Sequence, residues 1–328
     1  MRKPFFNVCT AVFSISGSII GAGFITGKEI NRFFGEDFSL SGIYLAFLLF
    51  AISFFIIMNI AEKGRLVAAV KFVVAICNVF IAACMVAALK SVYGELFNVS
   101  ENIKLLHIIS LIFAFIICFA GVRAIGVFSL ASIPFLIAVL IFVSLAYSDG
   151  GDINVSPRGS VGVVYPMLYV GINTMLSSGV IQGFGTTLSV KEKIATAVAT
   201  SLTLCLCIAI VGNAVRGVDG EMPLAELVAS NRKLYIIVHI LMLFAIFSTL
   251  VSSLYSVFSV LPSRYKTSCL TVLFLLVVFL SRFGFSSIVE NVYPVIGAVG
   301  IVYVAIFSSL FFRRVRRERT LPLRERKV

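Results

Sequence analysis

Charged residues are scarce in this chain. They make up 13% of its 328 residues, against 60% hydrophobic residues, and the mean hydropathy is +1.08. A composition of this kind excludes an ordinary soluble domain and is typical of polytopic membrane proteins. Long apolar runs recur throughout, so we expect a single membrane-embedded domain over residues 1–328.

The groups that enzymes use inside membranes are also missing. The four aspartates all lie outside the apolar segments, at Asp37, Asp149, Asp152 and Asp219. The chain has only two histidines, no His-Glu-x-x-His motif and no cysteine–histidine constellation. Intramembrane proteolysis and metal hydrolysis therefore lack their catalytic groups, and we expect no enzyme.

Cysteine is present, but not in a pattern that indicates disulfides or a metal centre. All seven cysteines lie in apolar segments, where they are typical of small buried side chains. The spacing Cys205-x-Cys207 is too short and isolated for a metal site. We expect no cofactor from these residues.

Ten apolar segments are long enough to be read as spans, given that a membrane helix needs about 20 mostly apolar residues. The ninth is the shortest. The sequence thus predicts an all-α polytopic membrane protein with ten transmembrane helices, at about 5–34, 41–61, 66–92, 104–121, 124–147, 161–188, 192–215, 234–260, 268–281 and 285–312.

The connections between these segments carry an asymmetric charge. With the N-terminus inside, 17 of the 27 basic residues fall on the cytoplasmic side, nine fall outside, and 11 of the 15 acidic residues fall outside. This bias predicts that both termini are cytoplasmic, in a cell (inner) membrane. The basic tail at 313–328 fits anionic lipids as partners, and the +12 net charge does not indicate nucleic acid.

Residues 17–23 interrupt the first span with three glycines. Each glycine costs a helix about 1 kcal/mol relative to alanine. One interpretation is a break whose free backbone groups bind a solute and a cation. The other is close helix packing, because Gly17-x-x-x-Gly21 is also a pattern of small residues at a helix interface.

A polar stretch at 148–160 divides the chain into two halves of five spans each. An odd number of spans per half is the arithmetic of an inverted-topology repeat, here about 5–147 and about 161–312. The sixth span is polar at 171–179, a position that corresponds to the break in the first span. Paired interruptions indicate a transporter site, and polar packing between helices is the alternative.

Three further features of the sequence each allow two interpretations. Ser248 and Thr249 offer two adjacent hard oxygen ligands, although such hydroxyls commonly bond their own helix. Lys28 and Glu290 could pair as an outer gate, with Glu29 beside them, or all three could be solvated interface charges. Residues 223–229 form a short helix over an outer vestibule or simply a surface helix.

The run from Gly17 to Phe24, followed by Gly27-Lys28-Glu29, resembles the first helix of the amino acid–polyamine–organocation (APC) superfamily, in particular its YkvI-like branch. The resemblance extends over the whole chain, through the polar sixth span, Met222-Pro223 in the outer loop and the hydroxyl pair of span eight. It implies a leucine-transporter-type fold, a 5+5 inverted repeat in which helices 1 and 6 are discontinuous. It also implies a secondary active transporter that takes up an amino acid or similar small organic solute by sodium symport.

The same resemblance implies two sets of site residues. The substrate contacts are Ile19, Gly21, Gly23, Asn173, Thr174 and Ser177. The sodium ligands are Gly17, Ile20, Ala245, Ser248 and Thr249. Proton-coupled relatives place a lysine in span five, and this chain has none there.

Two other functions remain as alternatives. A passive channel would be expected to show rings of charge or a carbonyl filter, and the sequence shows neither. A ligand sensor built on a transporter scaffold would keep the same solute site and is separated from a transporter only by measuring flux.

Overall fold

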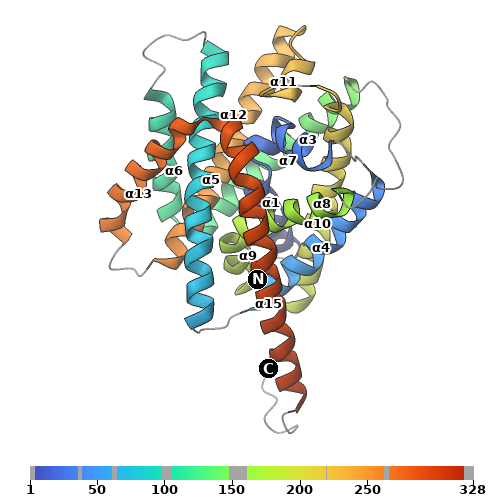
Figure 1. Ribbon diagram of the computed structural model, residues 1–328, viewed down its shortest axis with the longest axis vertical. Helices are drawn as coiled ribbons and strands as arrows, with labels where there is room; N and C mark the ends of the chain where they lie inside the picture. The colour runs from blue at the N-terminus through green and yellow to red at the C-terminus, as the bar shows by residue number, and fades with distance from the viewer. Residues whose placement is uncertain are drawn as a thin grey trace.

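The computed structural model describes residues 4–35, 39–60, 65–97, 105–147, 161–218, 220–261 and 266–320, and its elements are helices (Figure 1). The longer helices are α1 (Pro4–Ile19), α4 (Leu40–Asn59), α5 (Arg65–Phe97), α6 (Leu106–Phe119), α7 (Val122–Ala146), α8 (Val161–Leu176), α10 (Val190–Ala214), α12 (Arg232–Val260), α13 (Lys266–Leu280) and α15 (Tyr293–Thr320). The shorter ones are α2 (Ala22–Ile25), α3 (Lys28–Phe34), α9 (Ser178–Gly185), α11 (Pro223–Leu227) and α14 (Phe285–Ser287). A 3₁₀ turn (Ser281–Phe283) and a π turn (Ile288–Val292) flank α14.

Among the described residues, six helices are long and apolar enough to cross a membrane, and the bent pair α8–α9 makes a seventh if it is counted as one span. Three shorter apolar helices, at Pro4–Ile19, Leu106–Phe119 and Cys269–Phe283, lie where the sequence predicts further spans. The chain is thus an all-helical, multi-pass membrane protein. The count of ten spans stays a prediction.

Polar side chains fix where several of these helices begin. Ser39 accepts a hydrogen bond from the backbone N–H of Gly42 at the start of α4, and Asn231 caps α12 in the same way. Ser189 and Glu192 bond each other's backbone N–H groups in a capping box that opens α10. These bonds satisfy N–H groups that a helix leaves without an internal partner, so the helix starts can be read from the sequence.

Contacts at one end of the molecule join four helices. Lys193 of α10 donates to the side-chain oxygen of Asn59 at 3.2 Å, and Arg314 of α15 donates to the Asn59 carbonyl at 3.1 Å. Glu192 bonds Asn7 of α1. The start of α1, the end of α4, the start of α10 and the end of α15 therefore share one end, as the predicted topology requires.

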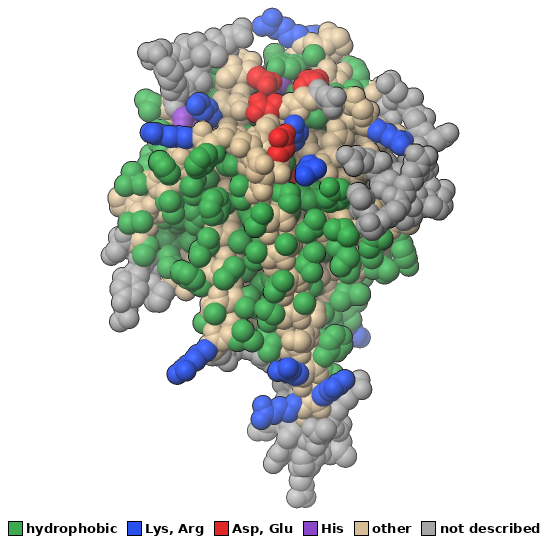
Figure 2. Space-filling model, viewed as in Figure 1, with side chains coloured by type: hydrophobic (Ala, Val, Ile, Leu, Met, Phe, Trp, Pro, Cys, Tyr) green, Lys and Arg blue, Asp and Glu red, His purple; other side chains and the backbone are tan. Residues whose placement is uncertain are grey.

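The opposite end gathers the connections predicted to lie outside. Tyr235 of α12 donates to Glu95 of α5 at 3.0 Å, and Ser286 donates to Glu221 at 3.2 Å. Figure 2 shows a broad apolar band, with the visible acidic side chains at this end and basic side chains at both ends. The contacts support the predicted grouping of connections, and which end faces the cytoplasm remains a prediction.

Helix α1 occupies the centre of the bundle, where it contacts α7, α8, α9, α10 and α12 (Figure 1). Helix α3 is held against α8 by aromatic packing. The ring of Tyr169 lies 5.8 Å from that of Phe33 and 5.2 Å from that of Phe34, between ring centroids. This packing sets the two interrupted segments side by side.

Candidate functional site

The first span is interrupted twice. Ile20 and Gly21 separate α1 from α2, and Thr26 and Gly27 separate α2 from α3. The Gly21 N–H donates to the carbonyl of Ile19 at 2.8 Å and not to that of Gly17, its partner in a continuous helix. At Gly27 the backbone has φ +80°, a conformation that favours glycine, and the chain turns there into α3. The predicted discontinuity of the first helix is therefore present.

The Gly17 carbonyl released by this break meets the hydroxyl pair on α12. Thr249 Oγ1 donates to it at 3.3 Å. Ser248 Oγ is buried and has no hydrogen-bond partner among the described residues. A Cβ added at Gly17 would lie 2.9 Å from Ser248 Oγ, and one added at Gly21 would lie 2.7 Å from Thr249 Oγ1. The structure thus brings Gly17, Ser248 and Thr249 together.

The other two residues of the predicted sodium set are buried on the same segments. Ile20 lies in the first break and Ala245 lies on α12, three residues before Ser248. Within the described ranges, no three His, Cys, Asp or Glu side chains gather as metal ligands. Hydroxyl and carbonyl oxygens are the donors available here, and such hard oxygens suit a small alkali cation.

The sixth span bends where the sequence places its interruption, by 58° between α8 and α9. The backbone hydrogen bonds nevertheless continue across the bend. Ser177 N–H donates to Asn173 at 3.1 Å, and Ile181 N–H donates to Ser177 at 2.9 Å. The Leu176 carbonyl accepts from Ser256 Oγ at 3.2 Å. The expected unwinding of helix 6 is therefore a kink in this structure, across which backbone hydrogen bonds are retained at Ser177 and Ile181.

The polar side chains around this kink differ in whether they are already hydrogen-bonded within the protein. Thr174 Oγ1 is buried without a hydrogen-bond partner among the described residues. The Ser177 hydroxyl donates to the Asn173 carbonyl at 2.6 Å, so it is engaged with its own helix. Asn173 Nδ2 donates to Glu29 at 3.3 Å and to the Tyr169 carbonyl at 3.0 Å. Asn173 therefore links the two interrupted spans directly.

Glu29 is a site residue that the sequence analysis left among the interface charges. Its side chain is buried, and a Cβ added at Gly23 would lie 2.5 Å from Glu29 Oε2. The turn at Gly27 orients α3 so that the Glu29 carboxylate packs against Gly23 of α2. Burying an unpaired carboxylate costs several kcal/mol, so its place between two interrupted helices calls for a function.

The predicted substrate contacts divide between two sides of the first break. Gly21 faces Thr249 and Gly23 faces Glu29, while Ile19 ends α1 between them. Helix α1 contacts both α8 and α9, and α2 contacts α12. The two interruptions are adjacent, with a hydroxyl cluster on one side and a carboxylate on the other.

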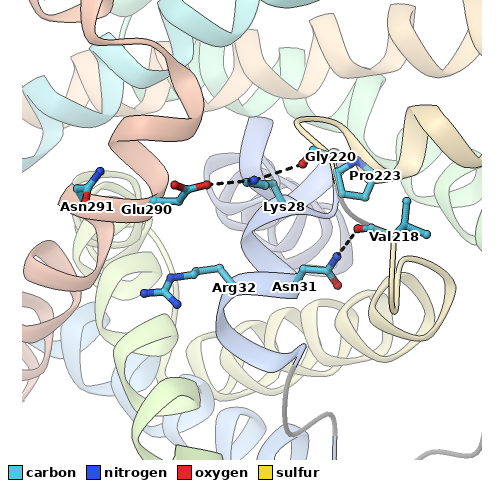
Figure 3. Close-up of a pocket in the computed structure, with 8 residues that line it drawn as sticks. All are labelled: Lys28, Asn31, Arg32, Val218, Gly220, Pro223, Glu290 and Asn291. Atoms are coloured by element: carbon cyan, nitrogen blue, oxygen red, sulfur yellow. Dashed lines mark hydrogen bonds and ion pairs between the residues drawn. The ribbon is translucent and has the colours of Figure 1, made fainter.

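An ion pair closes the outer side of this region. Lys28 Nζ lies 3.1 Å from Glu290 Oε1 and donates to the Gly220 carbonyl at 3.3 Å (Figure 3). Glu290 lies in the π turn, an irregularity often found at functional positions. An open pocket of about 460 Å³ lies over the pair, lined by Lys28, Asn31, Arg32, Val218, Gly220, Pro223, Glu290 and Asn291.

The outer connection before α12 is tied to the same part of the first span. The Leu224 N–H of α11 donates to the Thr26 carbonyl at 2.9 Å. Asn31 Nδ2 donates to the carbonyls of Val215 and Val218, at 3.0 and 3.2 Å. The short helix predicted in this loop is present as α11, and it is bonded to the second break.

Among the comparisons with known proteins, only the comparison with solved structures finds proteins similar to this chain. No family model and no curated protein matches it. It is similar to a structure of Mhp1, described as a nucleobase-cation-symport-1 family transporter in a closed conformation with bromovinylhydantoin bound. That match has 16% identity and a TM-score of 0.49, and covers 93% of this chain and 74% of the other.

A second similar structure is the Eremococcus coleocola manganese transporter in complex with an aromatic bis-isothiourea substituted compound. It is 14% identical, with a TM-score of 0.44, over 94% of this chain and 72% of that one.

Proposed function

We propose that this chain is a secondary active transporter that couples uptake of an amino acid or similar small organic solute to sodium. We assign it to the APC superfamily, in the YkvI-like branch, with a leucine-transporter-type 5+5 inverted repeat of ten spans. One observation carries the proposal. Two interrupted helices from opposite halves of the chain meet at the centre of the bundle, and unpartnered polar atoms lie at their junction.

In this proposal the sodium ion lies at the hydroxyl cluster. Gly17 and Ile20 supply carbonyl oxygens from α1 and the break, Ala245 supplies one from α12, and Ser248 and Thr249 supply hydroxyls. The unpartnered Ser248 Oγ supports this assignment, because a buried hydroxyl without a partner costs about 1–3 kcal/mol that a bound cation would recover.

The solute lies between the same two spans, against Ile19, Gly21, Gly23, Asn173, Thr174 and Ser177. Alternating access is then a rocking of α1–α4 and α8–α10 against the other helices, as in transporters built from inverted repeats. In this proposal the Lys28–Glu290 pair and α11 form the outer gate, supported by the ion pair and by the bond from the Leu224 N–H to the Thr26 carbonyl.

Transport is tested with purified protein in sealed vesicles. A mixture of radiolabelled standard amino acids should accumulate against its gradient when sodium is higher outside, and not when potassium replaces sodium. Binding without accumulation would favour the ligand sensor. Movement that only equilibrates the solute, with no dependence on the cation gradient, would favour the passive channel.

The cation site is tested by the double variant Ser248→Ala with Thr249→Ala. We expect it to lose all sodium dependence of uptake and of thermal stabilisation, because both hydroxyl ligands are gone. The matched control is Ser259→Ala on the same helix, whose hydroxyl bonds the Ser256 carbonyl at 2.7 Å and which should behave as the unmodified protein. Unchanged sodium dependence in the double variant would remove this site.

A further inference from the structure

The carboxylate of Glu29 lies between the two interrupted spans. Its Oε1 accepts from Asn173 Nδ2 at 3.3 Å, four residues before the kink at Ser177. Its Oε2 lies against Gly23, where a Cβ would come within 2.5 Å. The side chain is 4% exposed, so the carboxylate is enclosed by the site and does not face bulk solvent.

Neutral side chains surround this carboxylate. Tyr169 of α8, Cys84 of α5 and Tyr293 at the start of α15 are near enough to interact with it electrostatically. The Tyr293 hydroxyl donates to Cys84 Sγ at 3.6 Å. The Tyr169 hydroxyl is buried without a hydrogen-bond partner among the described residues. Besides the Glu29 carboxylate, this region therefore contains a buried hydroxyl, that of Tyr169, whose bonding capacity is unused.

Glu29 has no lysine, arginine or histidine as an ion-pair partner within the part of the chain that the structure describes. The cation next to it in sequence, Lys28, points the other way, toward Glu290 and the Gly220 carbonyl (Figure 3). A buried carboxylate without a fixed partner charge is strongly disfavoured. It is stabilised when a ligand brings the missing positive charge.

We propose that Glu29 binds the protonated amine of the transported solute. This inference rests on the proposed transport function and names its substrate class: solutes that carry a primary ammonium group, amino acids above all. An ammonium group has three N–H donors, and a carboxylate is its strongest natural acceptor. Glu29 takes one of these donors and the Tyr169 hydroxyl oxygen accepts a second.

The charge of Glu29 also accounts for selectivity. An uncharged solute, or one whose amine is replaced by a hydroxyl, would leave the carboxylate buried and uncompensated. A site built around a buried charged group rejects analogues that lack the matching group. The sodium ion of the proposed function is held elsewhere, by the Ser248 and Thr249 hydroxyls, so the two cations do not compete for one position.

The experiment measures thermal stabilisation of the purified full chain by matched pairs of probes. The pairs are L-alanine with L-lactate, L-leucine with 2-hydroxyisocaproate and L-phenylalanine with 3-phenyllactate. Each pair differs in the amine alone. A ligand stabilises only if it prefers the folded state, so half-saturation reports affinity. We expect at least one amino acid to stabilise the protein and its hydroxy acid to bind at least tenfold more weakly.

Glu29→Gln keeps the shape of the side chain and removes its charge. We expect it to weaken amino-acid binding at least tenfold while the sodium effect on stability persists. Glu29→Asp retains the charge one methylene further away and should bind with intermediate affinity. The control is Glu192→Gln, a half-exposed carboxylate in the first turn of α10, at the end of the molecule opposite the Lys28–Glu290 pair, which should bind as the unmodified protein.

The outcomes separate the two proposals. Equal binding of an amino acid and its hydroxy acid, or unchanged amino-acid binding in Glu29→Gln, would overturn the amine site and leave transport standing. If Glu29→Gln kept its amino-acid affinity but made uptake independent of pH, Glu29 would be a proton carrier, and the amine site would also be overturned. Failure of all six probes to stabilise the protein in sodium would overturn the amine site, whereas loss of sodium-driven accumulation would overturn the proposed function.

Discussion

The three glycines at the first interruption matter because they have no Cβ. A Cβ at Gly17, Gly21 or Gly23 would press on Ser248, Thr249 or Glu29 respectively. The sequence offered close packing and a binding break as alternatives for this stretch. The structure shows the break and the close packing together, because the break can approach its polar partners only where no Cβ stands between them, and binding at the break stays a proposal.

This close approach gives a prediction for Gly23→Ala. The added methyl forces the Glu29 carboxylate away from the break, and overpacking of this kind costs about 1–3 kcal/mol. We expect a lower midpoint of thermal unfolding, followed with a thiol-reactive dye that reports on the buried cysteines. The control is Gly94→Ala on α5, where nothing lies within 4 Å of the added Cβ. A drop of equal size in both variants would contradict the prediction.

Some residues of the candidate site could be predicted from their residue type. Others could not, because their place depends on how the chain turns or on where the side chain points. Adjacent hydroxyls such as Ser248 and Thr249 stand out in an apolar segment, and the structure places both beside Gly17, where Thr249 bonds the Gly17 carbonyl. The burial of Glu29 could not be predicted, because it depends on the left-handed turn at Gly27 that folds α3 back. The engagement of the Ser177 hydroxyl with its own helix was equally hidden, since the residue type alone does not show its rotamer.

At the level of elements, the outer gate combines one ion pair with several hydrogen bonds. Lys28 is 23% exposed and Glu290 is 51% exposed, so solvent screens their attraction and the pair alone contributes about 0–1 kcal/mol. The bonds from Asn31 and from the Leu224 N–H add to it. In the proposed function, an outer gate held this weakly can open during the transport cycle.

Glu290→Gln should therefore shift the protein toward an outward-open state. Cys84 is fully buried beside Tyr293, and we expect a small thiol reagent added from outside to alkylate it several-fold faster in this variant. Mass spectrometry identifies the modified cysteine. The charge swap Lys28→Glu with Glu290→Lys should restore the slow rate. No change in the rate for Glu290→Gln would show that the pair does not gate access to this site.

Two features of whole helices could not be predicted from the sequence pattern. The polar run at 171–179 correctly marks a discontinuity, but it cannot distinguish an unwound segment from the kink that the structure shows. Gly171 serves packing, since a Cβ there would lie 2.7 Å from the Gly297 carbonyl of α15. The partner helix decides between these roles, and it lies more than a hundred residues away in the sequence.

For the whole molecule, charge asymmetry predicted which connections lie together. The contacts of Asn59 with Lys193 and Arg314 join one set, and the contact of Ser286 with Glu221 joins part of the other. The pattern of charges does this because lysine and arginine are retained on the cytoplasmic side during insertion. The helix-to-helix packing within the band has no comparable signal in the sequence.

The absolute orientation is tested by cysteine labelling in intact cells. Glu221→Cys lies in the outer connection and should react with a membrane-impermeant maleimide directly. Arg316→Cys lies near the end of α15, in the basic run that follows its apolar part, and should react only after the membrane is permeabilised. The opposite pattern would invert the topology, and equal labelling of both positions would contradict the three spans predicted between residues 221 and 316.

The bond between the Leu224 N–H and the Thr26 carbonyl has a pharmacological consequence. It couples α11, whose Glu226 side chain is exposed, to a segment that moves in the proposed transport cycle. An antibody fragment or cyclic peptide that grips α11 would immobilise the carrier without touching its cavity. Inhibition of this kind would not be relieved by excess solute.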